Sequence, residues 1–344
     1  MTIIYLYRSL AAFGGVERIF IDKANYLAEH YGYHVYIITW EQGGHSIVYP
    51  LSPKVTHVDW GILFYRQYQY GLFKRMFMQW KMEKEFFKKL SNFVHTTQAD
   101  IVIGASCEFT TMAGMDLLQR KTHTILETHS MRTSIEKNNP PAGNLLMRWA
   151  FKRRDKQLHQ YIKHMSAFVT LTHNDAKDWS DITPQARIIP NMLHRYPAEI
   201  SPDKKTQKRI ITAGRLVEQK GYDLLLDAWS KVHQKHPEWI LDIYGEGEDK
   251  TMLLEKRKNL ALENSVLFHP PTLDIYQKYM DSDFYVMSSR FEGFGIPIIE
   301  ALYSGIPVVA ATGSCLEEAG GPDSIYVDPD DIKGMADAFK QIYA

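Results

Sequence analysis

The chain has 344 residues, of which 45% are hydrophobic and 23% charged, and it carries 40 basic and 40 acidic residues. This composition is typical of a soluble globular protein and excludes collagen-like, coiled-coil and disordered chains. The length predicts two domains, because a domain usually has about 100–200 residues. No apolar run reaches the roughly 18 residues of a membrane-spanning helix. The apolar start is too short for a signal peptide, and two cysteines (Cys107 and Cys315) favour a reducing compartment, so we expect a cytoplasmic protein.

The two halves of the chain differ in charge. Residues 1–200 contain 24 Lys and Arg against 17 Asp and Glu, a net charge of +7, whereas residues 201–344 contain 16 against 23, a net charge of −7. A basic half that faces an anionic partner would give this difference. Ordinary variation between the surfaces of two domains would give it as well, and the sequence does not decide between them.

Short apolar runs alternate with amphipathic stretches along the chain. The runs predict strands over 3–7, 34–40, 100–105, 123–128 and 167–172, and then over 209–214, 239–245, 265–269, 283–289 and 306–311. Helical patterns lie between most of them, for example over 16–30, 222–236 and 249–261. Fully apolar strands that alternate with helices predict parallel sheets with helices on both faces.

The alternation is interrupted over 190–208, where three prolines and a basic run indicate a linker. We therefore predict an α/β protein with two Rossmann-like, doubly wound domains, 1–195 and 205–344. Ligands of such sheets bind beyond the carboxyl ends of the strands. With two domains, the predicted place for the site is the cleft between them.

Two loops of the chain combine glycines with a following helix. Gly14 and Gly15 stand between the first strand and the first helix, where they let the backbone approach a ligand and an anion meet the helix N-terminus. A simple tight turn is the alternative. In the second half, Arg215 follows a strand and Lys220 precedes Gly221 and a helix. Two such cations suit a diphosphate, although two solvated surface charges would look the same.

A third glycine-rich segment, 287–310, carries two carboxylates. Glu292 lies in a loop after a strand, and Glu300 lies eight residues later, where we expect the first turn of a helix that has Pro297 at its start. Backbone N–H groups over 294–298 can bind a phosphate, and the carboxylates can accept hydrogen bonds from vicinal hydroxyls. The alternatives are a helix-capping glutamate for Glu300 and a solvated loop charge for Glu292.

Together these segments resemble a known family. FEGFGIPIIE (291–300) is similar to the signature of two glutamates separated by seven residues in GT-B fold retaining glycosyltransferases of family 4, the glycosyltransferase group 1 family. GRLVEQKG (214–221) resembles the diphosphate-binding loop of that family. ARIIPNM, IYGEGED, SGIPVVAATG and the glycine pair also match, in the expected order, over nearly the whole chain. The resemblance implies a GT-B fold, with two Rossmann-like domains that face an interdomain cleft.

The resemblance also implies roles for residues of the second domain. Arg215 and Lys220 would bind the nucleotide diphosphate, and Glu300 would hold the ribose hydroxyls. Glu292 would hold the donor sugar, as a catalytic residue, together with the backbone at three positions that follow it: Phe294, Gly295 and Ile296. Gly245 would line the nucleotide side, or it only forms a turn.

In the first domain, the resemblance implies that Gly14 and Gly15 let the first loop approach the phosphates of the donor. It assigns His129, in LETHSMR after a predicted strand, to sugar positioning or acceptor activation. A hydrogen-bonded loop histidine is the alternative. We therefore count His129 and Glu292 as the candidate catalytic residues.

The implied activity is hexosyl transfer from a nucleotide-diphosphate sugar, such as a UDP- or GDP-sugar, to a saccharide or lipid-linked acceptor. It would proceed with retention, without a metal cofactor, in the synthesis of a cell-surface polysaccharide or glycolipid, and no nucleic acid partner is expected. A nucleotide-sugar epimerase of the same fold and a non-catalytic nucleotide-sugar-binding protein remain alternatives. The C-terminal tail, which ends at Ala344, is short for the family. Asp281-Ser282-Asp283 indicates a turn rather than a metal site.

Residues 60–90 form a basic and aromatic segment. They contain seven Lys and Arg against Glu83 and Glu85, with interleaved aromatic residues such as Phe73, Phe77 and Trp80. Such a segment can lie on an anionic membrane, which would place the protein peripherally on the inner face of the cell membrane and suit a lipid-linked acceptor. The alternative is a helix that packs on its own sheet with a solvated basic side.

Overall fold

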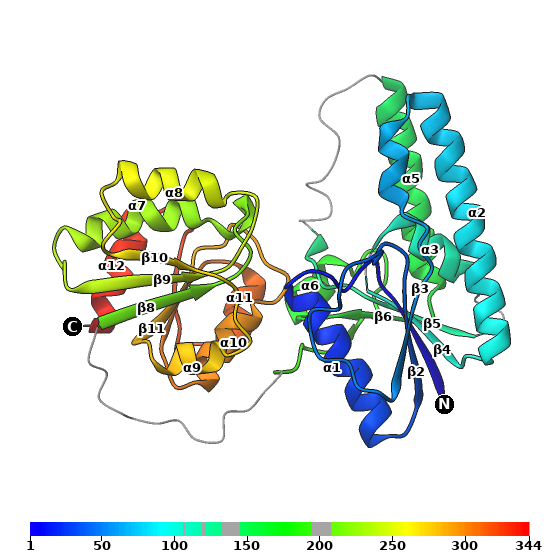
Figure 1. The fold of residues 1–344 in the computed structure, drawn as a ribbon, viewed down its shortest axis with the longest axis horizontal. Coiled ribbons are helices and arrows are strands. Elements are labelled where there is room, and N and C mark those ends of the chain that lie inside the picture. The colour runs from blue at the N-terminus through cyan, green and yellow to red at the C-terminus, as the bar shows by residue number, and fades with distance from the viewer. Residues whose placement is uncertain (106, 119–121, 133–144, 194–207, 344) are drawn as a thin grey trace. The chain divides into compact units, whose positions relative to one another are not determined.

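The computed structural model describes residues 1–105, 107–118, 122–132, 145–193 and 208–343. The chain divides into two compact units, Met1–Pro190 and Asn191–Ala344. Most of the predicted linker and both predicted domain limits, 195 and 205, lie outside the described residues. Each unit is an α/β layer structure around its own sheet (Figure 1).

The N-terminal unit contains a sheet with the strand order β3-β2-β1-β4-β5-β6-β7, parallel at every pairing between its described strands. The strands are β1 (Thr2–Leu6), β2 (His34–Thr39), β3 (Val55–Asp59), β4 (Ile101–Gly104), β5 (His123–Glu127), β6 (Ala167–Thr170) and β7 (Arg187–Ile188). The helices are α1 (Gly15–His30), η1 (Phe64–Gln69), α2 (Leu72–Thr97), α3 (Phe109–Asp116), α5 (Leu145–His164) and α6 (His173–Asp178).

The C-terminal unit has a second parallel sheet, ordered β10-β9-β8-β11-β12-β13. Its strands are β8 (Lys208–Ala213), β9 (Trp239–Tyr244), β10 (Val266–His269), β11 (Phe284–Met287), β12 (Val308–Ala311) and β13 (Ile325–Val327). Its helices are η2 (Glu218–Lys220), α7 (Tyr222–His233), α8 (Lys250–Asn259), α9 (Ile275–Met280), α10 (Ile296–Tyr303), α11 (Ser314–Gly320) and α12 (Ile332–Tyr343).

Alternation along the strands divides the core of each unit into two layers. In β1, Ile4 and Leu6 pack toward α2, while Ile3 and Tyr5 pack toward α1. Successive side chains of a strand point to opposite faces, so an unbroken apolar run buries both faces of a parallel sheet. This is why the apolar runs of the sequence mark the central strands.

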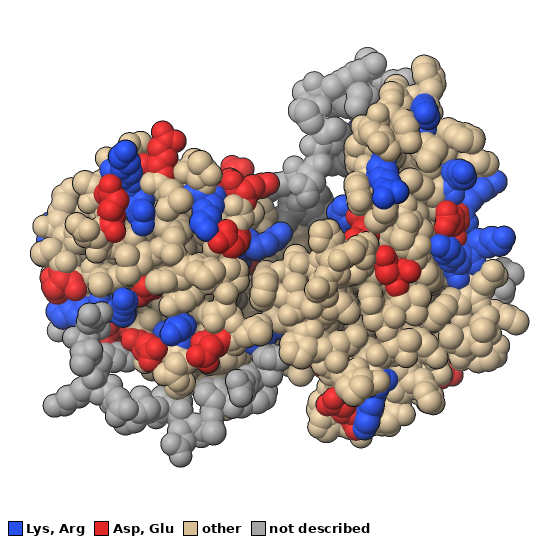
Figure 2. Space-filling model, viewed as in Figure 1, with Lys and Arg blue, Asp and Glu red and all other residues tan. Residues whose placement is uncertain are grey.

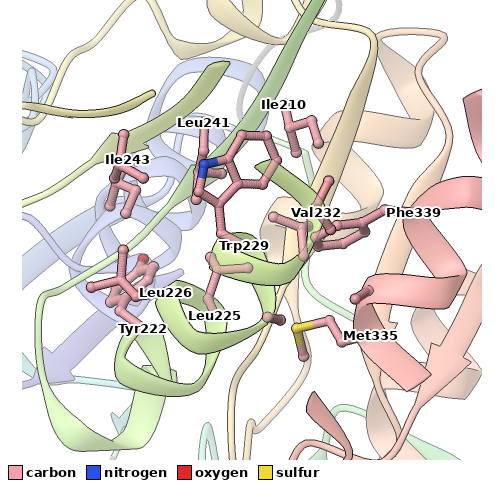
Figure 3. Packing of buried hydrophobic residues seen from close by; sticks show 14 of the residues in the cluster. Ile210, Tyr222, Leu225, Leu226, Trp229, Val232, Leu241, Ile243, Met335 and Phe339 are labelled. Atoms are coloured by element: carbon pink, nitrogen blue, oxygen red, sulfur yellow. The ribbon is translucent and has the colours of Figure 1, made fainter. Parts of the chain in front are cut away.

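Trp229 lies at the centre of one core layer of the C-terminal unit. Its ring packs among α7, α12 and the sheet, and it is close to Phe339 of α12 (Figure 3). The indole N–H is buried but satisfied, because it donates a hydrogen bond of 3.2 Å to Oγ of Ser265. The other face of the sheet packs on α9, α10 and α11. The loops at the strand ends therefore rest on a close-packed scaffold.

Both sheets reverse their strand order at one point. The reversal lies between β1 and β4 in the first sheet and between β8 and β11 in the second. Loops that leave the carboxyl ends of these neighbouring strands turn to opposite faces, and the crevice between them is the usual ligand site of a doubly wound sheet. The topology thus selects the loops after β1 and β4 in the first sheet and after β8 and β11 in the second.

The two predicted doubly wound domains are confirmed. All ten strands predicted from the sequence are present, with ends displaced by a residue or two. Three short strands, β3, β7 and β13, were not predicted. Each of them lies at the edge of its sheet.

Candidate functional site

The loops after β8 and β11 are joined at the reversal point of the second sheet. The main-chain N–H of Arg290 donates to the carbonyl of Gln219 at 2.8 Å, and the Ser288 hydroxyl donates to the carbonyl of Lys220 at 2.9 Å. Gly221 has φ of +62°, and a Cβ built there would lie 2.1 Å from the Ser288 carbonyl oxygen. Glycine is therefore required at this position both for its backbone conformation and for the close approach.

An Arg290–Asp223 pair braces the same two loops. The guanidinium donates to both carboxylate oxygens of Asp223, at 2.8 and 2.7 Å, and to the Glu218 carbonyl at 2.7 Å. Burial alone would raise the pKa of Asp223, but the neighbouring guanidinium outweighs it and lowers the pKa below its ordinary value. This bidentate geometry fixes the loop after β11 against the start of α7.

Lys220 and Glu292 form an ion pair at the centre of this arrangement. The ammonium donates to Oε1 of Glu292, and the Ser289 hydroxyl donates to the same oxygen at 2.7 Å. Only 16% of the lysine side chain and 10% of the glutamate side chain are exposed. The interpretation of Glu292 as a solvated loop charge is therefore wrong.

The lysine stem crosses Gly214 at the end of β8. A Cβ on Gly214 would lie 3.3 Å from Cε of Lys220, closer than ordinary packing allows. Arg215, the next residue, is exposed. Within the described ranges no carboxylate pairs with its guanidinium. The two predicted cations therefore lie on one loop, where Lys220 is held by Glu292 and Arg215 is open to an anion.

Glu300 is buried and oriented from a neighbouring helix. Its side chain lies in α10, and the Tyr279 hydroxyl at the end of α9 donates to its Oε2 at 3.1 Å. Burial, and then the carboxylate, raise the pKa of Tyr279 well above its ordinary value, so the phenol keeps its proton as the donor. The expected first-turn position is wrong: α10 begins at Ile296, which makes Glu300 its fifth residue.

The turn before α10 provides the backbone groups at this site. Gly295, with φ of +80°, is the N-cap, Ile296 is the first helical residue, and Phe294 is buried just before them. The Ile298 N–H already donates to the Gly295 carbonyl at 2.9 Å, and Pro297 has no N–H. The predicted cradle over 294–298 is thus shortened to the three residues 294–296.

Gly245 has a structural reason for lacking a side chain. A Cβ there would lie 1.9 Å from the carbonyl oxygen of Gly214, because the loops after β8 and β9 run against each other. The Leu216 N–H donates to the Glu246 carbonyl across the same contact at 2.9 Å. Gly245 therefore lets the loop that carries Arg215 pack closely on its neighbour.

In the N-terminal unit, His129 is buried beside a charged pair. Nε2 of its ring lies 3.5 Å from Oε2 of Glu127, which also accepts a hydrogen bond of 2.9 Å from Lys23 of α1. Burial alone would raise the pKa of Glu127, but His129 and Lys23 outweigh it and hold the pKa at about 2. Among the described residues, neither ring nitrogen of His129 has a well-formed hydrogen bond. The contact with Glu127 leaves both the hydrogen-bonded loop histidine and the functional role as predictions.

The glycine pair lies at the start of α1. Gly14 is the N-cap and Gly15 the first helical residue. A Cβ on Gly14 would meet only the carboxylate of Glu17, the mobile end of a side chain. Oε1 of Glu17 accepts a hydrogen bond of 3.1 Å from the Tyr7 hydroxyl. The carboxylate therefore occupies the positive end of α1, where the sequence predicted a phosphate.

The depressed pKa of Glu127 makes the stability of the N-terminal unit depend on pH. The ordinary pKa of this group is 4.5 and its value in the folded chain is about 2. The ionised contacts contribute about 3 kcal/mol above pH 4.5, and this contribution is lost as the pH falls toward 2. Glu127→Gln should therefore destabilise the chain at pH 7, with a difference from wild type that shrinks between pH 4.5 and 2.

Chemical unfolding at several pH values measures this difference. Glu85→Gln is the matched control, because Glu85 pairs with Lys89 on the exposed side of α2 and should change stability by less than about 0.5 kcal/mol. A constant difference between Glu127→Gln and wild type at all pH values would contradict the assignment.

Other features of the described residues bear on cofactors and membranes. Nowhere in these ranges do three or more His, Cys, Asp or Glu residues gather in a way that could hold a metal ion. None of the described helices is both long and apolar enough to cross a membrane. Asp281 is the C-cap of α9, and Asp283 accepts a hydrogen bond of 2.7 Å from the Arg209 N–H. Both aspartates of the Asp281-Ser282-Asp283 segment thus have structural roles between α9 and β11.

The predicted residues thus form two groups. Arg215, Lys220, Glu292 and the 294–296 turn lie on joined loops of the C-terminal unit, with Gly245 beneath them and Glu300 in the helix that follows. His129 and the 14–15 pair lie at strand ends of the N-terminal unit. Sequence reasoning missed the residues that orient these groups, which are Tyr279, Arg290, Asp223, Glu127 and Lys23.

Parts of this chain are similar in sequence to a known family model and to known proteins. Residues 198–344 match the family model of glycosyl transferases group 1. The match lies almost entirely within the C-terminal unit. A protein of Haemophilus influenzae described as an uncharacterized glycosyltransferase is 28% identical over 316 residues, which cover 89% of this chain and 79% of that protein. The amylovoran biosynthesis glycosyltransferase AmsD of Erwinia amylovora is 40% identical over 120 residues, 35% of this chain and 33% of that protein.

Solved structures extend the likeness beyond residues 198–344 to the whole chain. WaaG, a glycosyltransferase involved in lipopolysaccharide biosynthesis, matches with a TM-score of 0.74 and 15% identity over 99% of this chain and 90% of that one. HepE of Anabaena, solved with UDP-glucose, matches with a TM-score of 0.72 and 17% identity over 100% and 90% of the two chains. At such identities these matches concern the fold, which is GT-B.

Proposed function

We propose that this protein transfers a hexose from a nucleoside-diphosphate sugar to a saccharide or lipid-linked acceptor, with retention, in the synthesis of a cell-surface polysaccharide or glycolipid. The observation that carries the proposal is the Lys220–Glu292 pair beside the exposed Arg215, at the reversal point of a glycosyltransferase group 1 domain. Solved relatives with this fold include HepE in complex with UDP-glucose. LpsB of Rhizobium meliloti, 31% identical over 134 residues, is named as a lipopolysaccharide core mannosyltransferase.

The diphosphate would bind to the loop after β8. Arg215 offers a planar fork of donors and Lys220 a compact charge, and together they balance about two negative charges of a diphosphate. Cleavage of the bond between sugar and phosphate leaves more negative charge on the departing phosphate. Cations that are already in place stabilise this charge as it develops. No metal ion is needed in this scheme, so transfer should continue in EDTA.

The sugar hydroxyls would bind to the two carboxylates. Glu292 lies on the same loop as the turn 294–296 and its N–H groups, only two residues before it. Its carboxylate therefore suits the donor sugar. Glu300, oriented by Tyr279, suits the two vicinal hydroxyls of the ribose. A buried carboxylate that is held by a phenol accepts such hydroxyls without rearranging, which keeps the cost of binding low.

Donor binding would exchange the partners of Lys220. In this structure its ammonium is neutralised by Glu292. A diphosphate next to Lys220 competes for the ammonium, and the glutamate is then released to accept hydroxyls from the sugar. The hydrogen bond from Ser289 keeps the carboxylate in place during this exchange. The pair thus couples capture of the phosphate to capture of the sugar.

His129 would act on the sugar or the acceptor from the N-terminal unit. Its ring is fixed by the edge of Phe20 and by Glu127, while its nitrogens are not committed to strong hydrogen bonds among the described residues. The carboxylate of Glu127 lies 3.5 Å from Nε2 and helps to orient the ring. Such a ring can donate to a sugar hydroxyl near the reacting carbon.

A panel of nucleotides and nucleotide sugars tests this function. UDP, GDP and ADP, each with and without a sugar, are added to the protein and the melting temperature is measured. A ligand that binds only the native state raises it in proportion to its occupancy. We expect one base to dominate, with the sugar form stabilising most.

The best ligand then serves as donor in a transfer assay with saccharide and lipid-linked acceptors. NMR of the product gives its anomeric configuration, which should match the donor. Release of an isomerised free sugar would favour the epimerase alternative. Binding without turnover on any acceptor would favour the non-catalytic alternative, and a panel without any stabilising ligand would reject all three.

A further inference from the structure

Helix α2 extends well past the sheet that it covers. Its 26 residues make it about 39 Å long, whereas a five-residue strand spans only about 16 Å. All of its buried residues lie between Met82 and Val94, and none of the first ten residues, 72–81, is buried. Of these ten residues only the partly buried Met78 packs against the core of its own unit.

This overhanging half is apolar on one side. Five large side chains are exposed there although they are hydrophobic, and Phe73, at 87%, is almost fully exposed. At about 100° per residue they fall within an arc of about 140° on one face of the helix. They are Leu72, Phe73, Met76, Phe77 and Trp80. Tyr65 and Tyr68 of the adjoining η1 are exposed as well, and we call these seven side chains the α2 tip.

Basic side chains are interleaved with the aromatic rings of the α2 tip. Arg75 lies over the Tyr68 ring at 4.1 Å, Lys74 over the Tyr70 ring at 4.3 Å, and Lys84 over the Trp80 ring at 3.8 Å. No Asp or Glu occurs between Asp59 and Glu83. Lys and Arg gather over α2 in the space-filling view (Figure 2). The surface is thus apolar and strongly basic at once.

The basic residues at the start of α2 destabilise the helix electrostatically. Lys74 and Arg75 stand in the first turn, where the positive end of the helix dipole disfavours cations, and no acidic residue offsets them. An external anionic surface would remove this conflict. Apolar side chains that enter such a surface would also lose their contact with water.

We propose that the α2 tip docks on an anionic lipid membrane, with Phe73, Phe77 and Trp80 inserted and the cations at the lipid head groups. A membrane fits because it combines negative charge with an apolar layer directly beneath it. A second copy of this face would bring like charges together. A nucleic acid would leave Leu72 and Met76 without an apolar environment. The helix would lie along the surface, because its exposed apolar side chains share one face.

Sedimentation of the full chain with vesicles tests the proposal. We expect binding to vesicles of phosphatidylglycerol and phosphatidylcholine in equal parts, little binding to phosphatidylcholine alone, and weakening with salt. Combining Phe73→Ser, Phe77→Ser and Trp80→Ser should reduce partitioning at least about tenfold. The matched control combines Tyr31→Ser with Leu273→Ser, which removes two equally exposed apolar side chains elsewhere and should leave binding unchanged.

A charge-reversed variant separates docking from folding. Lys74→Glu with Arg75→Glu should weaken partitioning about 25-fold or more, yet the melting temperature should not fall, because acidic residues suit the first turn of a helix. Lys235→Glu with Lys258→Glu, on the C-terminal unit, is the control that keeps binding.

Several results would overturn the proposal. They are equal binding to neutral vesicles, binding that survives both α2 variants, and a dimer in light scattering that dissociates in those variants without any vesicle binding. Displacement from vesicles by RNA at matched charge would likewise assign the surface to nucleic acid. None of these readouts uses a nucleotide sugar, so failure here leaves the proposed transferase activity untouched.

Discussion

Lys220→Ala should weaken binding of the preferred nucleoside diphosphate by about 30- to 150-fold. The ammonium would make a charge-assisted hydrogen bond to a phosphate in a largely buried setting, and such bonds contribute about 2–3 kcal/mol. The variant also leaves Glu292 buried without its cation, so a negative charge now repels the diphosphate. Isothermal titration calorimetry with the ligand chosen from the nucleotide panel measures the effect.

Two further variants separate loss of the ligand from loss of the fold. Lys256→Ala breaks a comparable pair, at 2.7 Å from Asp227 between α8 and α7, and should leave affinity at the wild-type value. Lys220→Arg keeps the charge and should retain most of the binding. If Lys220→Ala bound the diphosphate as tightly as wild type, the loop after β8 would not be the phosphate site.

The sequence predicts the central strands well and the edges poorly. A central strand such as β11 is buried on both faces and therefore reads as an unbroken apolar run. The missed strands β3, β7 and β13 are edges, where burial is partial. In β3 only Val55 is buried, and His57 and Asp59 interrupt the apolar pattern. An edge strand forms mainly because a neighbour offers it a hydrogen-bonding partner, and a local pattern does not contain that information.

The site is predictable to a similar, partial extent. Strand ends can be located from the sequence, so the loops of Arg215, Lys220 and Glu292 could be placed on one edge of the sheet. Their contacts could not, because Lys220 and Glu292 are separated by 72 residues and meet only through the conformation of two loops. The same holds for Glu300, whose partner Tyr279 lies on another helix. The resemblance to a family implies the role of each single residue. The partners that orient these residues can be identified only from the three-dimensional structure.

Glu292→Gln should separate diphosphate binding from sugar transfer. The amide has nearly the same shape as the carboxylate and can still accept the hydrogen bond from Ser289, but it no longer neutralises Lys220. The freed ammonium and the loss of a nearby negative charge favour the anion, so affinity for the diphosphate without sugar should stay equal or rise up to about tenfold. Transfer should fall by about 10²–10³, because a sugar that is held loosely seldom reaches the reacting geometry.

The opposite directions of these two effects make the variant informative. Glu246→Gln is the matched control: it removes an exposed carboxylate from the neighbouring loop after β9, paired with Lys250 at 2.6 Å, and should change neither quantity. A Glu292→Gln variant that loses both binding and transfer would mean that the pair only holds Lys220 in place for the phosphate. One that keeps both would remove Glu292 from the reaction. Only tighter or equal binding with failed transfer fits a carboxylate that gives up its lysine to the phosphate in order to hold the sugar.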